Sequence, residues 1–253
     1  MSSKGKVAIV TGATGGIGFA VAKRLGQDGY TVILNGIDDS AGAERVKELT
    51  AEGIKAEYYG FDVTNEEAVT KNIKAIGEKY GKIDTLVNNA GGLGGRSRFE
   101  EMTTEFYRSV MALNLDSTFF ASRAAIPYLK KGENPSIINY TSNAAWTAGG
   151  PGAGIYGTSK AGVNAITKAL AKDLAEYGIR VNAVSPGTID TPFHAQIKAT
   201  KPEVFASWAN SIMLGRLGQP EDVSGVVSFL ASKDAAFITA ETIQIGGGQA
   251  LGI

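Results

Sequence analysis

Short apolar runs alternate with longer amphipathic stretches along most of the chain. The runs are rich in valine and isoleucine and stop at glycine or polar residues, which is typical of buried strands. The stretches between them repeat apolar side chains every three or four positions, which is typical of helices that cover a sheet. The pattern predicts strands over residues 6–11, 31–35, 56–61, 85–87, 136–141, 180–185 and 241–245, and helices over 17–25, 41–52, 66–80, 111–120, 156–177 and 220–231.

This alternation predicts one α/β domain over residues 1–253, with helices packed on a buried sheet. A chain of 253 residues, 43% of them hydrophobic, is long enough to enclose such a core. The sequence holds no internal repeat, low-complexity run or interdomain linker. The alternation breaks at residues 189–217, where short helical pieces and aromatic side chains follow a strand end. We interpret this insertion as a substrate lid.

Composition and charge argue against several kinds of partner. The 25 basic and 25 acidic side chains balance, so the basic excess typical of nucleic-acid binding is missing. The lack of cysteine excludes disulfides and thiolate chemistry, and with His194 as the one histidine we expect no metal site. No apolar run has the length of a membrane span, and residues 1–16 lack the order of a signal peptide. We therefore expect a soluble cytoplasmic protein.

A glycine-rich turn follows the first predicted strand and opens a helix. The amino end of that helix offers free N–H groups and a positive dipole, which predicts a site for the diphosphate of a dinucleotide. The spacing fits Gly12-x-x-x-Gly16-x-Gly18 and also Gly12-x-x-Gly15-x-x-Gly18, and it differs from the usual G-x-G-x-x-G. The residues of this predicted site are Gly12, Thr14, Gly15, Gly16, Ile17 and Gly18.

The end of the second predicted strand is where the adenosine ribose of a dinucleotide would lie. Gly36 occupies that end, and Asp38 and Asp39 follow it. Carboxylates there would bind the ribose hydroxyls and repel a 2′-phosphate, and no lysine or arginine occurs between Arg24 and Arg45. Charge therefore favours NAD over NADP as cofactor. The alternative is that the two aspartates merely cap the next helix.

Two further strand ends add candidate ligand contacts. Asp62 and Val63 close the third strand, which could place a carboxylate near the adenine amino group. Asn89, Ala90 and Gly91 follow the fourth strand. Strand ends that converge on amides and small residues predict a ligand crevice at the carboxyl edge of the sheet.

The candidate acid-base chemistry lies in the second half of the chain. Tyr156 and Lys160 are four residues apart in a predicted helix, so their side chains share one face. A nearby ammonium would lower the pKa of the phenol and make it a general acid or base. Ser142 ends the fifth strand at the same sheet edge. Asn114 lies among apolar neighbours, where a buried amide is either a structural bridge to backbone or part of a water relay.

Together these motifs resemble the short-chain dehydrogenase/reductase family in its ordinary short form. The resemblance covers nearly the whole chain: TGATGGIG at 11–18, DV at 62–63, NNAG at 88–91, Asn114, Ser142, YGTSK at 156–160 and PG at 186–187. It implies a Rossmann-type, doubly wound parallel sheet of about seven strands with helices on both faces. It also implies a catalytic tetrad of Asn114, Ser142, Tyr156 and Lys160. One departure is the spacing of Ser142 and Tyr156, which residues 143–155 separate by one residue more than is usual.

The resemblance further implies roles for these residues. Tyr156 exchanges a proton with the substrate oxygen, and Ser142 hydrogen-bonds the same oxygen. Lys160 holds the nicotinamide ribose, and Asn114 anchors a water. The residues Pro186, Gly187, Thr188 and Thr191 follow the sixth strand, and the two threonines would bind the carboxamide and diphosphate. The NGID stretch at 35–38 is similar to that of some NAD-linked hydroxybutyrate dehydrogenases, and a homotetramer paired through helices 117–130 and 156–177 is implied as well.

The substrate is the least determined feature. Candidate contacts are Ser142, Asn143, Trp146, Gly150, Tyr156, Phe193, His194, Gln196 and Trp208. Arg98 could meet a carboxylate; the alternative is that Arg96 and Arg98 are both surface charges or pair with Glu100 and Glu101. The mixed polar and aromatic set favours a small polar carbonyl compound, a hydroxy acid or a sugar-type alcohol. A 3-oxoacyl-(acyl-carrier-protein) reductase, a nucleotide-sugar epimerase or dehydratase, and a non-catalytic dinucleotide sensor are the alternatives.

Overall fold

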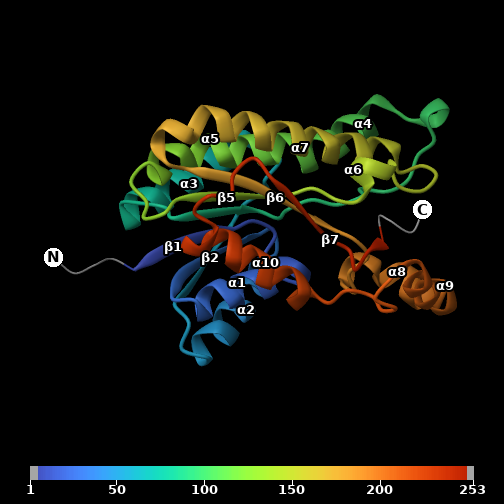
Figure 1. The fold of residues 1–253 in the computed structure, drawn as a ribbon, viewed down its shortest axis with the longest axis horizontal. Coiled ribbons are helices and arrows are strands. Elements are labelled where there is room, and N and C mark those ends of the chain that lie inside the picture. Colours follow the sequence, from blue (N-terminus) through green and yellow to red (C-terminus); the bar gives the residue numbers. More distant parts are fainter. Residues whose placement is uncertain (1–4, 250–253) are drawn as a thin grey trace.

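Seven parallel strands form one sheet in the computed structural model, which describes residues 5–249 apart from the side chains of Phe193 and Gln196 (Figure 1). The sheet order is β3-β2-β1-β4-β5-β6-β7. The strands are β1 (Lys6–Val10), β2 (Tyr30–Gly36), β3 (Ala56–Gly60), β4 (Thr85–Asn88), β5 (Ser136–Tyr140), β6 (Arg180–Pro186) and β7 (Thr242–Ile245). The order reverses between β1 and β4, and such a reversal opens a ligand crevice at the carboxyl ends of the strands. The predicted doubly wound fold is confirmed.

Helices cover both faces of the sheet, with α3, α5 and α7 on one face and α1, α2 and α10 on the other (Figure 1). Each layer has its own apolar core. Among the described residues no helix is long and apolar enough to cross a lipid bilayer. The longer helices are α1 (Gly16–Gln27), α2 (Asp39–Ala51), α3 (Glu66–Tyr80), α4 (Thr104–Met111), α5 (Ser117–Leu129), α7 (Gly154–Leu174) and α10 (Pro220–Ala231).

Polar side chains mark the starts of two helices, and a glycine marks the end of one of them. Asp38 caps α2, because its carboxylate accepts from the backbone N–H of Ala41 at 3.0 Å. Asn65 caps α3 in the same way. Gly81 ends α3 in the left-handed conformation, φ 78°, which only glycine adopts at low cost. The predicted bounds of α3 and α10 agree with the structure because these signals are local.

Two regions differ from the predicted pattern. In place of one helix over 111–120, the chain forms α4, a π-helical segment η2 (Ala112–Asp116) and α5. The loop before α7 contains a short helix, α6 (Ala144–Thr147), and the backbone turns back at Ala148 with φ 61°. The insertion over 189–217 does hold short helical pieces, as expected: η4 (Pro192–His194), α8 (Ala195–Thr200), α9 (Pro202–Ser207) and η5 (Trp208–Ser211).

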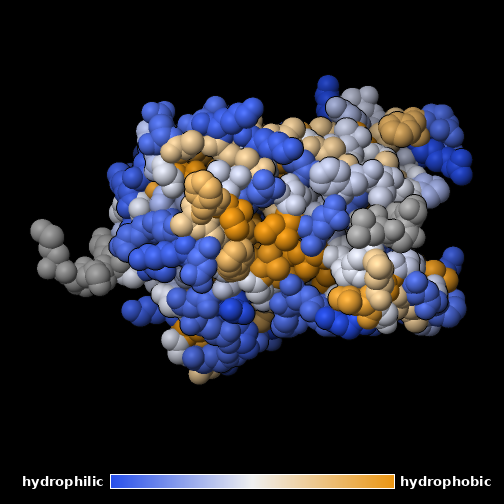
Figure 2. All heavy atoms as spheres, viewed as in Figure 1, coloured by the Kyte–Doolittle hydropathy of each residue, from blue (hydrophilic) through white to orange (hydrophobic). Residues whose placement is uncertain are grey.

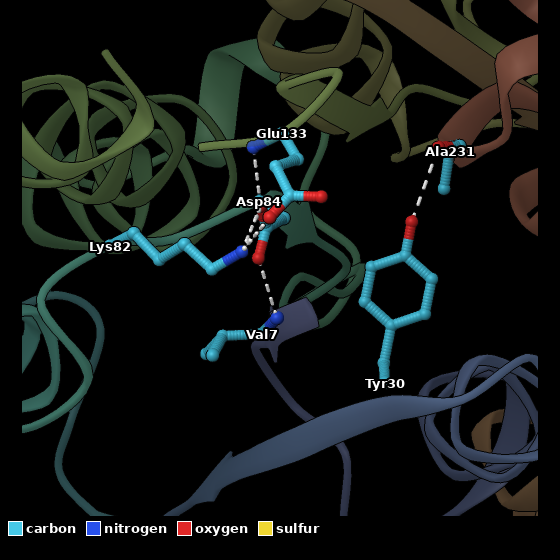
Figure 3. Close-up of polar contacts among 6 residues, drawn as sticks. All are labelled: Val7, Tyr30, Lys82, Asp84, Glu133 and Ala231. Carbon is cyan, nitrogen blue, oxygen red and sulfur yellow. Dashed lines mark hydrogen bonds and ion pairs between the residues drawn. The ribbon is translucent and has the colours of Figure 1, made fainter. Parts of the chain in front are cut away.

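The buried carboxylate of Asp84 connects the central strands at their amino ends, opposite the crevice (Figure 3). Asp84 is fully buried, and its two oxygens accept from the backbone N–H groups of Val7 at 2.7 Å and Glu133 at 2.5 Å. Lys82 supplies the countercharge at 3.3 Å. Because Asp84 lies just before β4 and contacts the start of β1 and the approach to β5, it fixes the central strands relative to one another.

Candidate active site

The glycine turn forms a cradle at the amino end of α1. Gly12 has φ 62°, and Gly15 is extended and caps the helix. A β-carbon on Gly18 would overlap the Gly12 carbonyl oxygen, so the close passage of helix and turn requires glycine there. Asn89 fastens the turn, because its side-chain N–H groups donate to the carbonyls of Thr11 at 2.9 Å and Gly12 at 3.0 Å. The free N–H groups of the first helical turn therefore point to a fixed anion site.

Ser142, Tyr156 and Lys160 meet where β5 ends and α7 begins. Lys160 is 3% exposed, and its Nζ donates to the carbonyl of Tyr140 at 2.8 Å. Nζ lies 5.9 Å from the centre of the Tyr156 ring. The Ser142 hydroxyl accepts from the backbone N–H of Ala144 and donates to the Asn143 side chain, both at 3.2 Å. The predicted shared edge of strand end and helix start is thus present.

The electrostatics of this cluster differ from the sequence-based expectation. Burial lowers the pKa of Lys160 to about 7. Burial also raises the pKa of Tyr156, and the neighbouring Ser142 hydroxyl offsets part of that rise. The expected lowering of the tyrosine pKa by the lysine is therefore not found in the protein alone. The physical reason is that the low-dielectric site disfavours both charges at once.

The Asn114 side chain bridges backbone groups, which is one of the two roles that the sequence left open. Its side-chain amide donates to the carbonyls of Gly92 and Val110 and accepts from the backbone N–H of Gly92, all at 2.9 Å. A β-carbon on Gly91 would lie 2.8 Å from Asn114 Oδ1 and 2.9 Å from Lys160 Nζ. Asn114 thus holds the loop after β4 closely against the lysine. The π-helical turn places it there, a geometry that often marks functional sites.

One cavity of about 810 Å³ joins the glycine cradle to this cluster, within the volume range of small-molecule sites. Of the predicted cofactor and catalytic residues, the lining includes Gly15, Gly16, Ile17, Gly18, Asn89, Gly91, Ser142, Tyr156, Lys160, Pro186, Gly187, Thr188 and Thr191. The lining does not include Gly12, Thr14, Gly36, Asp38, Asp62, Val63, Ala90 or Asn114.

The region expected to bind adenosine contains an arginine that the sequence did not place there. Arg45 reaches back from α2, and its Nε donates to the carbonyl of Thr14 at 3.3 Å. Its charge is paired with Glu48 at 2.6 Å. Asp38 caps α2, with one carboxylate oxygen accepting from the backbone N–H of Ala41, and Asp39 is the first residue of that helix. The i, i+3 spacing indicates the ion pair of Arg45 with Glu48. No sequence signal indicates the contact of Arg45 with Thr14.

The insertion over residues 189–217 and the loop before α7 form the other end of the cavity. Asn143, Gly150, His194 and Trp208 line it, whereas Trp146 is 56% exposed on α6 and is not part of the lining. The His194 ring packs 5.3 Å from that of Trp208, and burial lowers the histidine pKa. The side chains of Phe193 and Gln196 lie outside the described residues. Residues 5–249 contain no group of three or more acidic, histidine or cysteine side chains suited to a metal ion.

Gln249, beyond the last strand, is a cavity residue that the sequence did not indicate. Its side-chain oxygen accepts from the backbone N–H of Thr188 at 2.9 Å, and its amide donates to the Thr188 hydroxyl at 2.9 Å and to Ser211 at 3.3 Å. It therefore joins Ser211 of the insertion to the loop after β6. Only the tertiary structure brings residues 61 positions apart into contact.

The doubly wound sheet, the glycine cradle and the serine, tyrosine and lysine beside it define a dinucleotide-binding oxidoreductase. Residues 12–250 match the family model described as Enoyl-(Acyl carrier protein) reductase. The chain belongs to the short-chain dehydrogenase/reductase family. The family resemblance drawn from the sequence is confirmed. Members of this family are oxidoreductases that bind a nicotinamide dinucleotide and act on CH–OH groups, and this chain is one of them.

Three relatives show the extent of the similarity. The chain is 39% identical over 250 residues to a 3-oxoacyl-(acyl-carrier-protein) reductase of Thermotoga maritima, covering 98% of this chain and 99% of that protein. Ligand-free aldohexose dehydrogenase of Thermoplasma acidophilum has a TM-score of 0.87 at 36% identity, covering 97% and 94% of the two chains. A single-residue variant of actinorhodin polyketide ketoreductase, solved with NADPH, has a TM-score of 0.91 at 32% identity, with 99% of each chain covered.

Proposed function

We propose that the protein interconverts a secondary alcohol and a ketone, with Tyr156 moving the proton. The observation that carries this proposal is the single cavity that Ser142, Tyr156 and Lys160 share with the amino end of α1. A sensor that merely bound a dinucleotide would need the glycine cradle. It would not need a hydroxyl, a phenol and a buried amine gathered beside it.

The chemistry of each group follows from its surroundings. The dinucleotide supplies or accepts a hydride when bound. The raised pKa keeps the Tyr156 phenol protonated at neutral pH, which suits it to donate a proton to a carbonyl oxygen during reduction. The Ser142 hydroxyl would hydrogen-bond the same oxygen. In the alcohol-to-ketone direction the deprotonated form of Tyr156 would take the proton, and protonated Lys160 would stabilise that phenolate beforehand.

The residues present fit a dinucleotide. The N–H groups of Gly16, Ile17 and Gly18 would hold the diphosphate, and Lys160 would hold the nicotinamide ribose. Thr188 and Thr191 would bind the carboxamide and diphosphate. The predicted contacts outside the cavity would surround the adenosine: Gly12, Thr14, Gly36, Asp38, Asp62, Val63 and Ala90.

NAD is the proposed cofactor. Asp38 follows the strand end at which a 2′-phosphate would lie, and the nearby Arg45 is already paired with Glu48. NADPH is the alternative, since one relative was solved with it. Arg45 is the cation that would decide in its favour if its pair with Glu48 opened.

The proposed substrate is a small polar carbonyl compound, hydroxy acid or sugar-type alcohol. Asn143 and Gln249 provide amides at the cavity, and Trp208 provides an aromatic surface. A 3-oxoacyl-(acyl-carrier-protein) reductase activity is the second candidate, favoured by the 39% identity to the Thermotoga maritima enzyme. The cytoplasmic location expected from the sequence stays a prediction.

The proposed assembly is a homotetramer. Phe119 on α5 is 39% exposed and gives the face expected to pair an apolar character, and Tyr107 on the neighbouring α4 is 45% exposed. Figure 2 shows a second apolar region over α10 and β7. Phe229 on α10 is 40% exposed, Phe237 in the connection from α10 to β7 is 105% exposed, and β7 is an edge strand. Two separate self-complementary faces are what a tetramer of two-fold symmetry needs.

The proposed function is tested with a panel of ketones, hydroxy acids, polyols and acyl thioesters, assayed with NADH or NAD⁺ and with the NADP forms. The variant Tyr156→Phe removes the phenolic proton and keeps the ring. We expect turnover to fall at least about 100-fold, while the dissociation constant for the dinucleotide stays nearly unchanged. Tyr177→Phe, near the far end of the same helix, is the matched control and keeps wild-type turnover.

The results of these assays distinguish the proposals. Wild-type turnover by Tyr156→Phe would refute the role of the tyrosine. Dinucleotide binding without turnover of any panel compound would favour the sensor. Activity confined to acyl thioesters would favour the second candidate, and a clear preference for NADPH would overturn the assignment of NAD.

A further inference from the structure

The cavity has an unbalanced charge. None of the residues described as lining it is aspartate or glutamate. The lysine and arginine side chains of the lining are Lys160 and Arg96. Lys160 sits deep in the site with its ammonium on the Tyr140 carbonyl, and the lowered pKa of His194 leaves that ring uncharged at neutral pH. Arg96 is therefore the cation left for a ligand group away from the lysine.

Two glycine-rich loops hold Arg96 at the cavity wall. Arg96 lies in the connection between β4 and α4, and its Nη1 donates to the carbonyl of Pro151 at 2.9 Å. Beside it the backbone N–H of Ser97 donates to the carbonyl of Gly152 at 3.0 Å. A β-carbon on Gly150 would lie 3.6 Å from Nη1, so the guanidinium rests close to that backbone. In Figure 1, α6 and α4, the helix that this connection enters, lie above α8 and α9 in the view.

The guanidinium keeps its charge and most of its donors. Over residues 5–249, no acidic side chain lies within ion-pair distance of Arg96, and its described side-chain hydrogen bond is the one to Pro151. A guanidinium has five N–H donors in a planar fork, and a neutral carbonyl orients it without neutralising it. Arg96 and Arg98 are both exposed, but Arg98 lies outside the lining. No ion pair joins either arginine to Glu100 or Glu101 in the described part of the chain.

We propose that Arg96 binds a carboxylate on the substrate, so that the protein prefers hydroxy acids and keto acids, sugar acids included, over neutral alcohols and ketones. This inference rests on the proposed function. A planar guanidinium with unused N–H groups matches a carboxylate bidentately. The anion would lie at the wall built by Arg96 and Gly150, while Tyr156 meets the reacting oxygen. Arg96 is a specificity residue in this arrangement and takes no part in proton transfer.

The test uses matched pairs that differ in charge: 3-hydroxybutyrate against its methyl ester, and gluconate against glucitol. The ratio of kcat/KM between acid and neutral partner is measured for wild type, Arg96→Gln, Arg96→Lys and Arg98→Gln. We expect a ratio of at least about 10 in wild type, and a fall toward 1 in Arg96→Gln, carried mainly by KM for the acid. Arg96→Lys should restore part of the ratio, and the control Arg98→Gln should keep it.

Binding provides a readout that does not need turnover. Calorimetric titration of the dinucleotide-loaded protein with gluconate should detect binding by wild type and at least about tenfold weaker binding by Arg96→Gln. A wild-type ratio near 1, or one unchanged in Arg96→Gln, would overturn the inference. So would acetoacetyl-coenzyme A outperforming the acids in an Arg96-dependent manner, because the anion would then be a phosphate. If the neutral partners still react and depend on Tyr156, only the role of Arg96 fails; if no compound reacts, both proposals fail.

Discussion

The Lys160 side chain is buried, and its burial makes the stability of the protein depend on pH. Its pKa is about 7 in the folded protein, against 10.5 ordinarily. Below pH 7 the folded and unfolded chains both hold the proton, so the cost of burying the charge is fully present. Between pH 7 and 10.5 the unfolded chain binds more protons, so stability rises with pH at up to about 1.4 kcal/mol per pH unit.

Removing the amine should remove that slope. We expect the free energy of unfolding of wild type, from urea titrations at pH 7, 8 and 9, to rise more steeply than that of Lys160→Met. Lys168→Met, an exposed lysine on the same helix, is the control and should keep the wild-type slope. Equal slopes for wild type and Lys160→Met would show that the pKa of Lys160 is not lowered in the folded protein.

At the scale of elements, Asp84 joins the central strands through β4. Both of its oxygens accept backbone N–H groups, so Asp84→Asn would turn an amide N–H₂ toward one of these donors and leave Lys82 without its buried counterion (Figure 3). Loss of a buried charge pair with unsatisfied donors costs about 3 kcal/mol. We expect a loss of that size in urea denaturation, with the dissociation constant for the dinucleotide unchanged because the crevice lies at the other edge.

The matched control is Glu133→Gln. The Glu133 side chain also contacts Lys82, at 3.1 Å, but is 70% exposed. Exposed pairs contribute little, so the control should lose less than about 1 kcal/mol. Similar losses of unfolding free energy in Asp84→Asn and Glu133→Gln would mean that surface charge, and not the buried carboxylate, stabilises the contact between the strands.

At the scale of the whole molecule, the two apolar faces predict how the assembly comes apart. Phe119→Glu places a charge on the α5 face, and Phe237→Glu places one in the connection between α10 and β7. Burying an unpaired charge in an interface is costly, so each single variant should form dimers and the double variant monomers. Sedimentation velocity measures the three masses.

Lys71→Glu on the exposed side of α3 is the control for the change of charge and should stay tetrameric. A wild-type protein that sediments as a monomer would contradict the proposed assembly. Dimers formed by the double variant would mean that a third face holds subunits together.

Much of the fold could be predicted because its signals are local. Every predicted strand agrees with the structure to within one residue at each end, since a buried parallel strand is an apolar run that stops at a turn. The i, i+4 spacing of Tyr156 and Lys160 and the strand end at Ser142 were enough to bring these three to one edge. The one-domain interpretation stays a prediction, consistent with the single sheet.

The sequence by itself determined the order of strands and helices, the glycine cradle and the identity of the candidate acid-base groups, because periodicity and turn chemistry act over a few neighbouring residues. Tertiary structure decided the rest. It set the π-helical turn that bonds Asn114 to Gly92, the reach of Arg45 to Thr14, and the choice of Arg96 rather than Arg98 at the cavity. It also set the direction of the pKa shift of Tyr156, because burial and distant contacts depend on how the whole chain packs.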